Sequence, residues 1–274
     1  MKSMNNSCLM VAKKKPLVLC HVNQVAMSCI ANGLLAIGAS PLMSISTQES
    51  EDLMKITDAV YINIGTLDAA FLDHCHCSIA YAKKHHIPVI VDPVGAGASH
   101  LRTDAAKALI ASAAVIKGNA SEIMALTQDA ICTMGTETQH DVALAIPSAI
   151  SLARQYQVIV AVSGATDFVT DGKRHYNVFH GDVMMTYVTG MGCLLTAIIA
   201  SFVSSQIAGC LETVCHAIAY YNICGTIAAK SAQGPSQFIQ QFIDTLYQGI
   251  PEQFEHLQPF KSIEYPGFPE VQYD

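Results

Sequence analysis

The segment 188–193, Val-Thr-Gly-Met-Gly-Cys, runs directly into a long apolar stretch that begins at Leu194. Glycines before a helix let backbone N–H groups turn toward one point, where the helix dipole adds positive potential. Gly190 and Gly192 are therefore candidates for an anion hole that receives a phosphoryl group. Cys193 falls in the first turn, where the same field lowers a thiol pKa and favours a catalytic base or nucleophile. A purely structural glycine turn is the alternative.

Three other known loops do not match this segment. A dinucleotide fingerprint has a third glycine and opens the first βα unit of a chain. A Walker loop needs Gly-Lys-Ser/Thr, and a cysteine phosphatase loop needs an Arg soon after the Cys, which 194–204 does not contain. The pattern favours a different phosphate-binding arrangement.

Two carboxylates follow apolar runs that are typical of strands. Asp92 ends the run 89–92 and precedes Pro93, and Glu122 follows the run 115–117. The carboxyl edge of a parallel sheet is where α/β proteins gather ligands. Two carboxylates and an anion hole at one edge would suit Mg²⁺ and nucleotide phosphates. The alternative for Glu122 is compensation of a helix dipole.

The elements that must position these residues alternate along the chain. Nearly continuous apolar runs predict strands covered on both faces, and the longer stretches between them predict helices. The expected strands are 17–20, 60–64, 89–92, 115–117 and 158–162, and the expected helices are 26–37, 69–84, 104–112, 121–126 and 141–156. This alternation predicts an α/β fold of three layers, with a mostly parallel central sheet flanked by helices.

The later part of the chain changes its pattern. The turn Asp171-Gly172 between 167–170 and 174–179 predicts a β-hairpin, and helices are expected at 193–204, 211–231 and 236–247. We find no repeat and no linker, so we expect a single domain over 1–274 with its core at 16–248. The segments 1–15 and 249–274 are expected to be extended tails.

Composition limits the possible partners. The chain has 274 residues, a formal net charge of −7, and only 14% charged against 51% hydrophobic residues. An acidic chain without clustered Lys and Arg is a poor candidate for binding nucleic acid. So few charges imply a large core or a large buried oligomer interface.

The cysteines and the apolar stretches indicate the cellular compartment of the protein. Ten cysteines, without paired Cys-x-x-Cys motifs, indicate reduced thiols rather than disulfides. The uncharged stretch 16–48 after three lysines imitates a secretion signal, but His21, Asn23 and Gln24 interrupt it. The run His74-Cys75-His76-Cys77 imitates a metal site, but contiguous helical residues point about 100° apart and do not converge. We expect a soluble, cytoplasmic protein that neither enters a membrane nor binds nucleic acid.

Several motifs in order resemble the hydroxyethylthiazole kinase family. They are the segments 32–41, 62–67, 92–97, 118–122 and 190–193, and the likeness extends over about 17–230. The resemblance implies a ribokinase-like fold and a homotrimer with active sites between subunits. It implies transfer of the γ-phosphoryl group of ATP, with Mg²⁺, to the hydroxyl of 4-methyl-5-(2-hydroxyethyl)thiazole in thiamine biosynthesis or salvage.

The resemblance also assigns roles to residues. By it, Cys193 is the catalytic base, Gly190 and Gly192 form the anion hole, and Asp92 and Glu122 serve Mg²⁺ and the phosphates. The positions it implies for the nucleotide are Lys117 and Ser163, and those for the thiazole are Asn23, Met43, Gly65 and Gly190.

The chain departs from the family pattern at four positions. Lys117 stands where an Arg is usual, Ser163 and Met191 where Thr is usual, and Val22 where a Thr precedes the matched Asn. Lys keeps the charge but loses the bidentate fork of Arg. Two alternatives therefore stay open: a kinase of the same fold for another small alcohol, and a degenerate module that binds thiazole or nucleotide without turnover.

Overall fold

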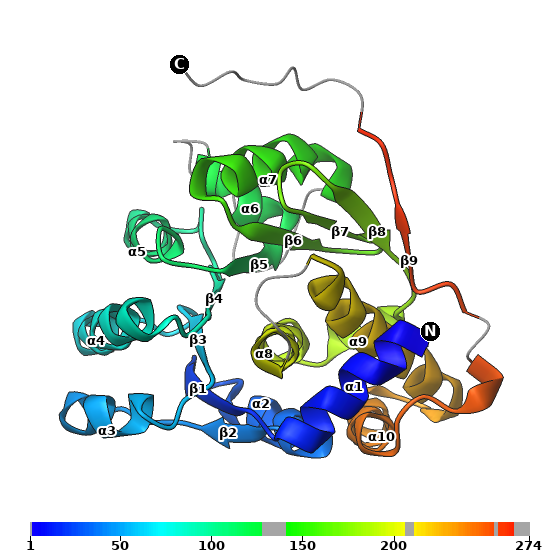
Figure 1. Ribbon diagram of the computed structural model, residues 1–274. Helices are drawn as coiled ribbons and strands as arrows, with labels where there is room; N and C mark the ends of the chain where they lie inside the picture. The colour runs from blue at the N-terminus through cyan, green and yellow to red at the C-terminus, as the bar shows by residue number, and fades with distance from the viewer. Residues whose placement is uncertain (1, 128–140, 206–210, 255–256, 266–274) are drawn as a thin grey trace.

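A single sheet of nine strands runs through the molecule in the order β2-β1-β3-β4-β5-β6-β7-β8-β9 (Figure 1). The computed structural model describes residues 2–127, 141–205, 211–254 and 257–265. The strands are β1 (Leu17–His21), β2 (Ser40–Leu42), β3 (Ala59–Asn63), β4 (Val89–Asp92), β5 (Val115–Asn119), β6 (Ile159–Ser163), β7 (Asp167–Thr170), β8 (His175–Val178) and β9 (Phe260–Ser262). The first six strands in chain order pair in parallel, and β7, β8 and β9 continue the sheet antiparallel.

Helices cover both faces of the sheet, so the molecule has three layers (Figure 1). One face carries α1 (Lys2–Lys14), α2 (Met27–Ala36), α8 (Met191–Ser205), α9 (Leu211–Ser231) and α10 (Pro235–Gln248). The other carries α3 (Ser50–Met54), α4 (Ala69–His85), α5 (His100–Ile110), α6 (Ala120–Thr127) and α7 (Val142–Tyr156). Short 3₁₀ helices lie at η1 (Thr47–Glu49), η2 (Val183–Tyr187) and η3 (Glu252–Phe254).

The strands are apolar because each contributes to two cores. In β1, Val18 and Cys20 join the core under α8, whereas Leu19 joins the core under α4. All five residues of β3 are buried. This double coverage explains the unbroken apolar runs from which the parallel strands were predicted, and the predicted three-layer α/β fold is confirmed.

The predicted extended tail at 1–15 is wrong. Residues 2–14 form α1, which packs against α8 and α9. Met4, Ser7 and Val11 are buried at the three- and four-residue spacing of a helix face. The Ser7 hydroxyl also lies 3.0 Å from His216 Nδ1 of α9. Tertiary packing stabilises a helix whose own sequence, rich in Asn and Ser, has weak propensity.

Part of the second predicted tail is also ordered. Residues 260–262 form β9, which pairs with β8 and is the last strand at that side of the sheet. The 3₁₀ helix η3 precedes it, and Phe254 is buried against the protein. Within this predicted tail, residues 255–256 and 266–274 lie outside the described part of the chain.

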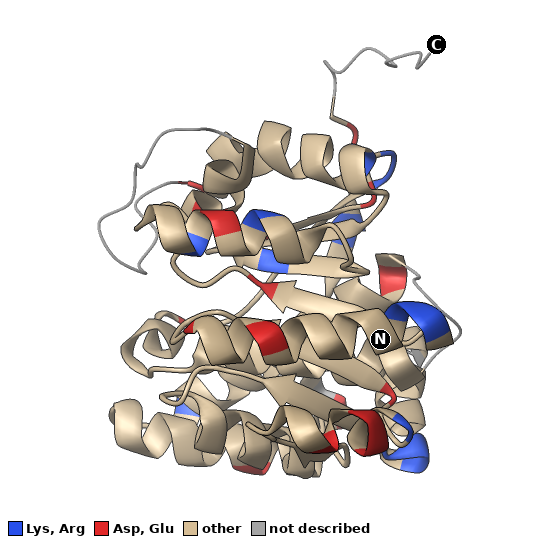
Figure 2. Cartoon of the chain, turned by 90° about the vertical axis from the view of Figure 1, so that its left-hand side faces the viewer, with Lys and Arg blue, Asp and Glu red and all other residues tan. Residues whose placement is uncertain are grey.

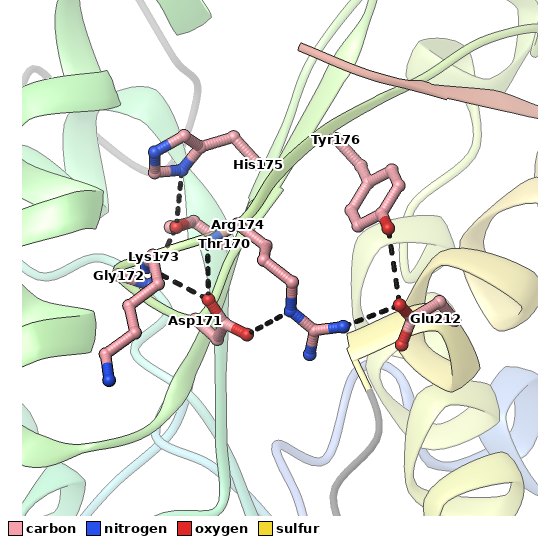
Figure 3. A network of polar contacts seen from close by, with 8 residues as sticks. All are labelled: Thr170, Asp171, Gly172, Lys173, Arg174, His175, Tyr176 and Glu212. Carbon is pink, nitrogen blue, oxygen red and sulfur yellow. Dashed lines mark hydrogen bonds and ion pairs between the residues drawn. The ribbon is translucent and has the colours of Figure 1, made fainter. Parts of the chain in front are cut away.

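The predicted hairpin is present and is fastened to α9 (Figure 3). Asp171 caps the turn by accepting from the N–H groups of Lys173 and Arg174. The Arg174 guanidinium donates to Asp171 at 2.9 Å and to Glu212 of α9 at 2.7 Å. Because the Arg174 side chain is about half exposed, this network orients the hairpin more than it stabilises the fold.

Acidic and basic positions are interspersed over the elements rather than gathered in one stripe (Figure 2). Among the described residues, no helix combines the length and the apolar character needed to cross a bilayer. The described cysteines are all free thiols, as predicted. In the run 74–77, His74 and Cys75 are buried whereas His76 and Cys77 are exposed.

Candidate active site

The predicted site residues meet at the carboxyl edge of the sheet. Asn63 at the end of β3 is the register partner of Asp92 at the end of β4. Asn119 at the end of β5 is the partner of Ser163 at the end of β6. The N-terminus of α8 packs over this edge, with contacts from α8 to β1, β3 and β4.

Gly190, directly before α8, has a backbone conformation that residues with a side chain rarely adopt. Its φ is +87°, and its carbonyl accepts the first helical hydrogen bond from Leu194 N–H at 2.8 Å. None of the described residues accepts from the N–H groups of Met191, Gly192 and Cys193. Three backbone donors at the positive end of a helix are thus available to an anion.

Asp92 is almost completely buried, at 1% exposure, yet no Lys or Arg in the described part of the chain forms an ion pair with it. Its Oδ2 accepts from Thr196 at 2.8 Å and from Tyr61 and Asn63 at 3.3 Å each. None of the described residues donates a hydrogen bond to Oδ1. Burial raises the pKa of Asp92, although the charge of Lys117 opposes the change.

Lys117 lies inside the site and not in solvent. Its side chain is buried, and Nζ donates to the Gly192 carbonyl at 3.2 Å. Burial lowers the pKa of Lys117, but the carboxylates of Asp92 and Glu122 outweigh it and raise the pKa above its ordinary value. The ammonium group stays charged beside the start of α8.

Glu122 joins two loops at the sheet edge. Its Oε2 accepts from Asn119 N–H at 2.8 Å, while Asn119 Oδ1 accepts from Glu122 N–H at 3.0 Å. This reciprocal pair is a capping box at the start of α6. Oε1 accepts from Gly95 N–H in the loop after β4 at 2.9 Å. Burial, together with the nearby charge of Asp92, raises the pKa of Glu122 to about 7.

The predicted lowering of the Cys193 pKa is wrong. Cys193 is half-buried at the third position of α8. Burial, and next the charge of Asp92, raises its pKa to about 11, against the opposing effect of Lys117. The helix field is present, but desolvation of the thiolate is the larger effect.

The residues predicted to contact the thiazole lie on the β1 and β3 side of the edge. Asn23 is buried and donates to the Cys193 sulfur at 3.4 Å. The backbone of Gly65 lies so close to Asn23 that a Cβ added to Gly65 would be 2.8 Å from Asn23 Cβ. Met43, just after β2, is half-buried against the core under α8.

Ser163 lies at the end of β6, next to β5. Its hydroxyl donates to the Gly118 carbonyl at 3.4 Å, a long contact. It is therefore on the same edge as Lys117 but one strand nearer to β7.

Sequence reasoning missed the polar residues that hold this site together. Tyr61 donates to the Cys193 carbonyl at 2.9 Å, and Thr196 supports Asp92. Arg102 on α5 donates to the carbonyls of Ile64, Gly65 and Val94, fixing the loops after β3 and β4. In the sequence Arg102 is a lone basic residue just before the predicted helix 104–112, a placement too common to be informative.

The acidic residues fit Mg²⁺ in part. Asp92 offers a carboxylate oxygen to which none of the described residues donates, and hard oxygen ligands suit Mg²⁺. Glu122 already accepts a backbone N–H on each oxygen. Within the described residues there is no group of three or more His, Cys, Asp or Glu side chains able to hold a metal by themselves. A site of this kind needs phosphate oxygens to complete the coordination.

The fold of this chain, a mostly parallel sheet with the start of α8 at its carboxyl edge, is ribokinase-like. A ribokinase-like superfamily protein from Enterococcus faecalis has a TM-score of 0.61, with 15% identity, over 85% of this chain and 87% of that chain. At this identity the likeness shows the fold.

The chain belongs to the hydroxyethylthiazole kinase family, whose family model matches residues 9–252. The hydroxyethylthiazole kinase of Chlamydia abortus is 41% identical over 249 residues, covering 90% of this chain and 95% of the relative. That of Serratia proteamaculans is 39% identical over 251 residues, covering 91% and 95%. The structure of the hydroxyethylthiazole kinase protein from Pyrococcus horikoshii has a TM-score of 0.87 at 32% identity, covering 96% of this chain and all of that chain.

Proposed function

We propose that this protein transfers the γ-phosphoryl group of ATP to the hydroxyl of 4-methyl-5-(2-hydroxyethyl)thiazole, giving the thiazole phosphate for thiamine biosynthesis or salvage. The observation that carries the proposal is the start of α8. Its three N–H groups, at residues 191–193, have no partner among the described residues, and Lys117 lies 3.2 Å from the Gly192 carbonyl. Membership of the family supports the substrate class.

In the proposed reaction the alcohol oxygen bonds to the γ-phosphorus while the bond to the β,γ-bridging oxygen breaks, and ADP leaves. The N–H groups of residues 191–193 and the Lys117 ammonium stabilise the charge on the transferred group. Cys193, in its thiolate form, accepts the proton of the alcohol and becomes the thiol. Because such transition states are loose, positioning and charge neutralisation supply most of the rate and the base a smaller part.

Nucleotide and thiazole occupy opposite ends of the edge. Lys117 and Ser163, on β5 and β6, serve the nucleotide. Asn23, Met43 and Gly65, around β1 and β3, contact the thiazole, for which the Met43 thioether offers a soft apolar surface. Gly190, between the two, lets both ligands approach the backbone.

Asp92 would hold Mg²⁺, with Glu122 as the second acid. When bound, the ion neutralises triphosphate charge that this acidic chain does not otherwise balance. We expect Asp92→Asn to remain folded, because amide and carboxyl have the same shape, and to lose most turnover. Initial rates across Mg²⁺ concentrations measure this, and near-normal rates at limiting Mg²⁺ would remove Asp92 from the metal site.

We also propose a cytoplasmic homotrimer with active sites between subunits. The resemblance to the family suggests the assembly, and exposed apolar residues in the loops next to the site support it: Val25, Ile45, Val183 and Tyr187. Free thiols support a reducing compartment.

A coupled ADP-release assay across thiazole, pyrimidine and sugar alcohols tests the proposal, with thermal shift by ATP and by the thiazole alcohol measured separately. Turnover with the thiazole alcohol at much higher kcat/KM than with the others is the expected result. Preference for a sugar or pyrimidine alcohol would assign a different kinase of the same fold. Binding of both ligands without ADP release would assign a degenerate binding module.

A further inference from the structure

Asn63 lies at the centre of the polar network and is completely buried. Its Oδ1 accepts from Asn23 Nδ2 at 2.9 Å and from Gly65 N–H at 3.0 Å. Its Nδ2 donates to the Tyr61 hydroxyl at 2.9 Å and to Asp92 Oδ2 at 3.3 Å. All four hydrogen-bonding positions of the amide are used, so its orientation is fixed.

The acceptor side of Asn63 controls the direction of Asn23. Asn23 Nδ2 carries two hydrogens, one directed to Asn63 Oδ1 and the other toward the Cys193 sulfur at 3.4 Å. Asn23 Oδ1 accepts from Ala26 N–H at 3.0 Å. With both oxygens held by donors, the Asn23 amide can present only N–H to the sulfur.

The donor side of Asn63 controls Tyr61. The Tyr61 oxygen accepts from Asn63, and its single proton has two acceptors, the Cys193 carbonyl at 2.9 Å and the more distant Asp92 Oδ2 at 3.3 Å. The same residue therefore influences Cys193 at two atoms, the sulfur through Asn23 and the carbonyl through Tyr61. Asn63 also acts on the Cys193 side chain directly, and both this interaction and the hydrogen bond from Asn23 oppose the rise in the Cys193 pKa.

We propose that Asn63 is a positioning residue that fixes the Cys193 thiol for proton acceptance by holding Asn23 in the orientation that donates to sulfur. The proposal rests on the proposed function for its link to turnover. A hydrogen bond to sulfur favours the thiolate, which is the form that accepts the alcohol proton. Asn63 thus couples the thiazole side of the site to the phosphoryl-transfer side.

The test uses Asn63→Leu, which keeps the approximate shape but makes no hydrogen bond, and Asn63→Ala, whose smaller side chain leaves room for water if the first does not fold. We expect kcat to fall by about tenfold or more, up to the roughly 10²-fold that a general base supplies. The KM for ATP should stay near the parent value. Thr170→Val, which removes a buried hydroxyl in the hairpin far from Cys193, is the control for a general loss of stability.

A second readout is independent of kinase activity. Alkylation of Cys193 by iodoacetamide at one pH, followed by mass spectrometry, should slow by about tenfold in both Asn63 variants, as loss of a hydrogen bond to a charged group predicts. The exposed Cys77 on α4 is an internal reference whose rate should not change. If no alcohol is phosphorylated at all, this measurement still tests the role of Asn63.

A double-mutant cycle with Asn23→Ala shows whether the effect passes through Asn23. The Asn63 substitution should then add little to the loss already caused by Asn23→Ala, both in kcat and in alkylation rate. Fully additive losses would overturn the proposal. So would an unchanged alkylation rate at Cys193, or a change confined to the KM for ATP.

Discussion

At the scale of single residues, desolvation raises the pKa of the Cys193 thiol by more than the field of helix α8 lowers it. The sequence places the thiol correctly in the first turn of α8, where the field alone lowers its pKa. The distance of Asp92 from the thiol and the depth of the site are tertiary properties, and they raise the pKa to about 11 instead. At neutral pH only the small thiolate fraction of Cys193 can accept the alcohol proton, so the base contributes less than it would at higher pH.

Replacing Cys193 tests this role. Cys193→Ala should reduce turnover by roughly 10²-fold, at the low end for a general base, and leave ATP binding intact. Because a base acts when deprotonated, kcat/KM of the parent should keep rising with pH toward the thiol pKa. In Cys193→Asp the rise should occur about four to five pH units lower, since carboxyl groups ionise at lower pH. pH–rate profiles measure both, and a fully active Cys193→Ala would show that the thiol only packs.

Lys117 is the residue at which this chain departs from the family's Arg. Its Nζ is buried among carboxylates and lies beside the start of α8. Lys117→Ala should raise the KM for ATP by about tenfold or more, because it removes a charged donor to phosphate, whereas Lys117→Arg should keep activity. Initial rates against ATP concentration distinguish them. An ATP dependence unchanged in Lys117→Ala would mean that the side chain does not serve the nucleotide.

At the scale of elements, the sequence predicted the parallel strands and the edge at which they end. Strands covered on both faces leave unbroken apolar runs, so Asp92 and Lys117 could be placed at or near strand ends. The short strands β2 and β9 carry no periodicity over three residues and were missed. The network of Tyr61, Asn63 and Thr196 was also beyond prediction, since it depends on the strand register and on α8 crossing the sheet edge.

The start of α8 can be tested through Gly190. Its positive φ disfavours any side chain, so Gly190→Ala should lower the free energy of unfolding by about 1–2 kcal/mol. It should also weaken ATP binding, because the N–H groups of residues 191–193 would turn. Gly249 after α10 also has a positive φ, +81°, and a Cβ there would meet nothing within 4 Å. Gly249→Ala is therefore the matched control, expected to destabilise without changing ATP affinity.

Chemical denaturation and ATP titration measure the two effects. Equal loss of ATP affinity in Gly190→Ala and Gly249→Ala would assign the effect to stability alone. Normal ATP affinity in Gly190→Ala would remove the helix start from the phosphate site.

At the scale of the whole molecule, the high apolar fraction is accounted for mainly by two cores, one on each face of the sheet. Composition allowed either a large core or a large interface between subunits, and the fold supplies the large core. The apolar residues that remain exposed near the site are candidates for an interface. Ile45 is 90% exposed after β2, Val25 is 67% exposed after β1, and Val183 and Tyr187 are each 69% exposed in η2, just before α8.

These four residues lie in loops that follow the carboxyl ends of strands or lead into α8, at the edge where the site residues meet. Exposed apolar side chains gathered beside a site are typical of an interface. If the active sites lie between subunits, Ile45→Asp should both dissociate the trimer and reduce turnover, because a buried charge opposes association. Ile56→Asp, at a residue 59% exposed in the loop before β3 at the opposite edge of the sheet, should change neither. Light scattering and the ADP assay, run on the same samples across protein concentrations, measure assembly and activity together, and a fully active monomer would defeat the prediction.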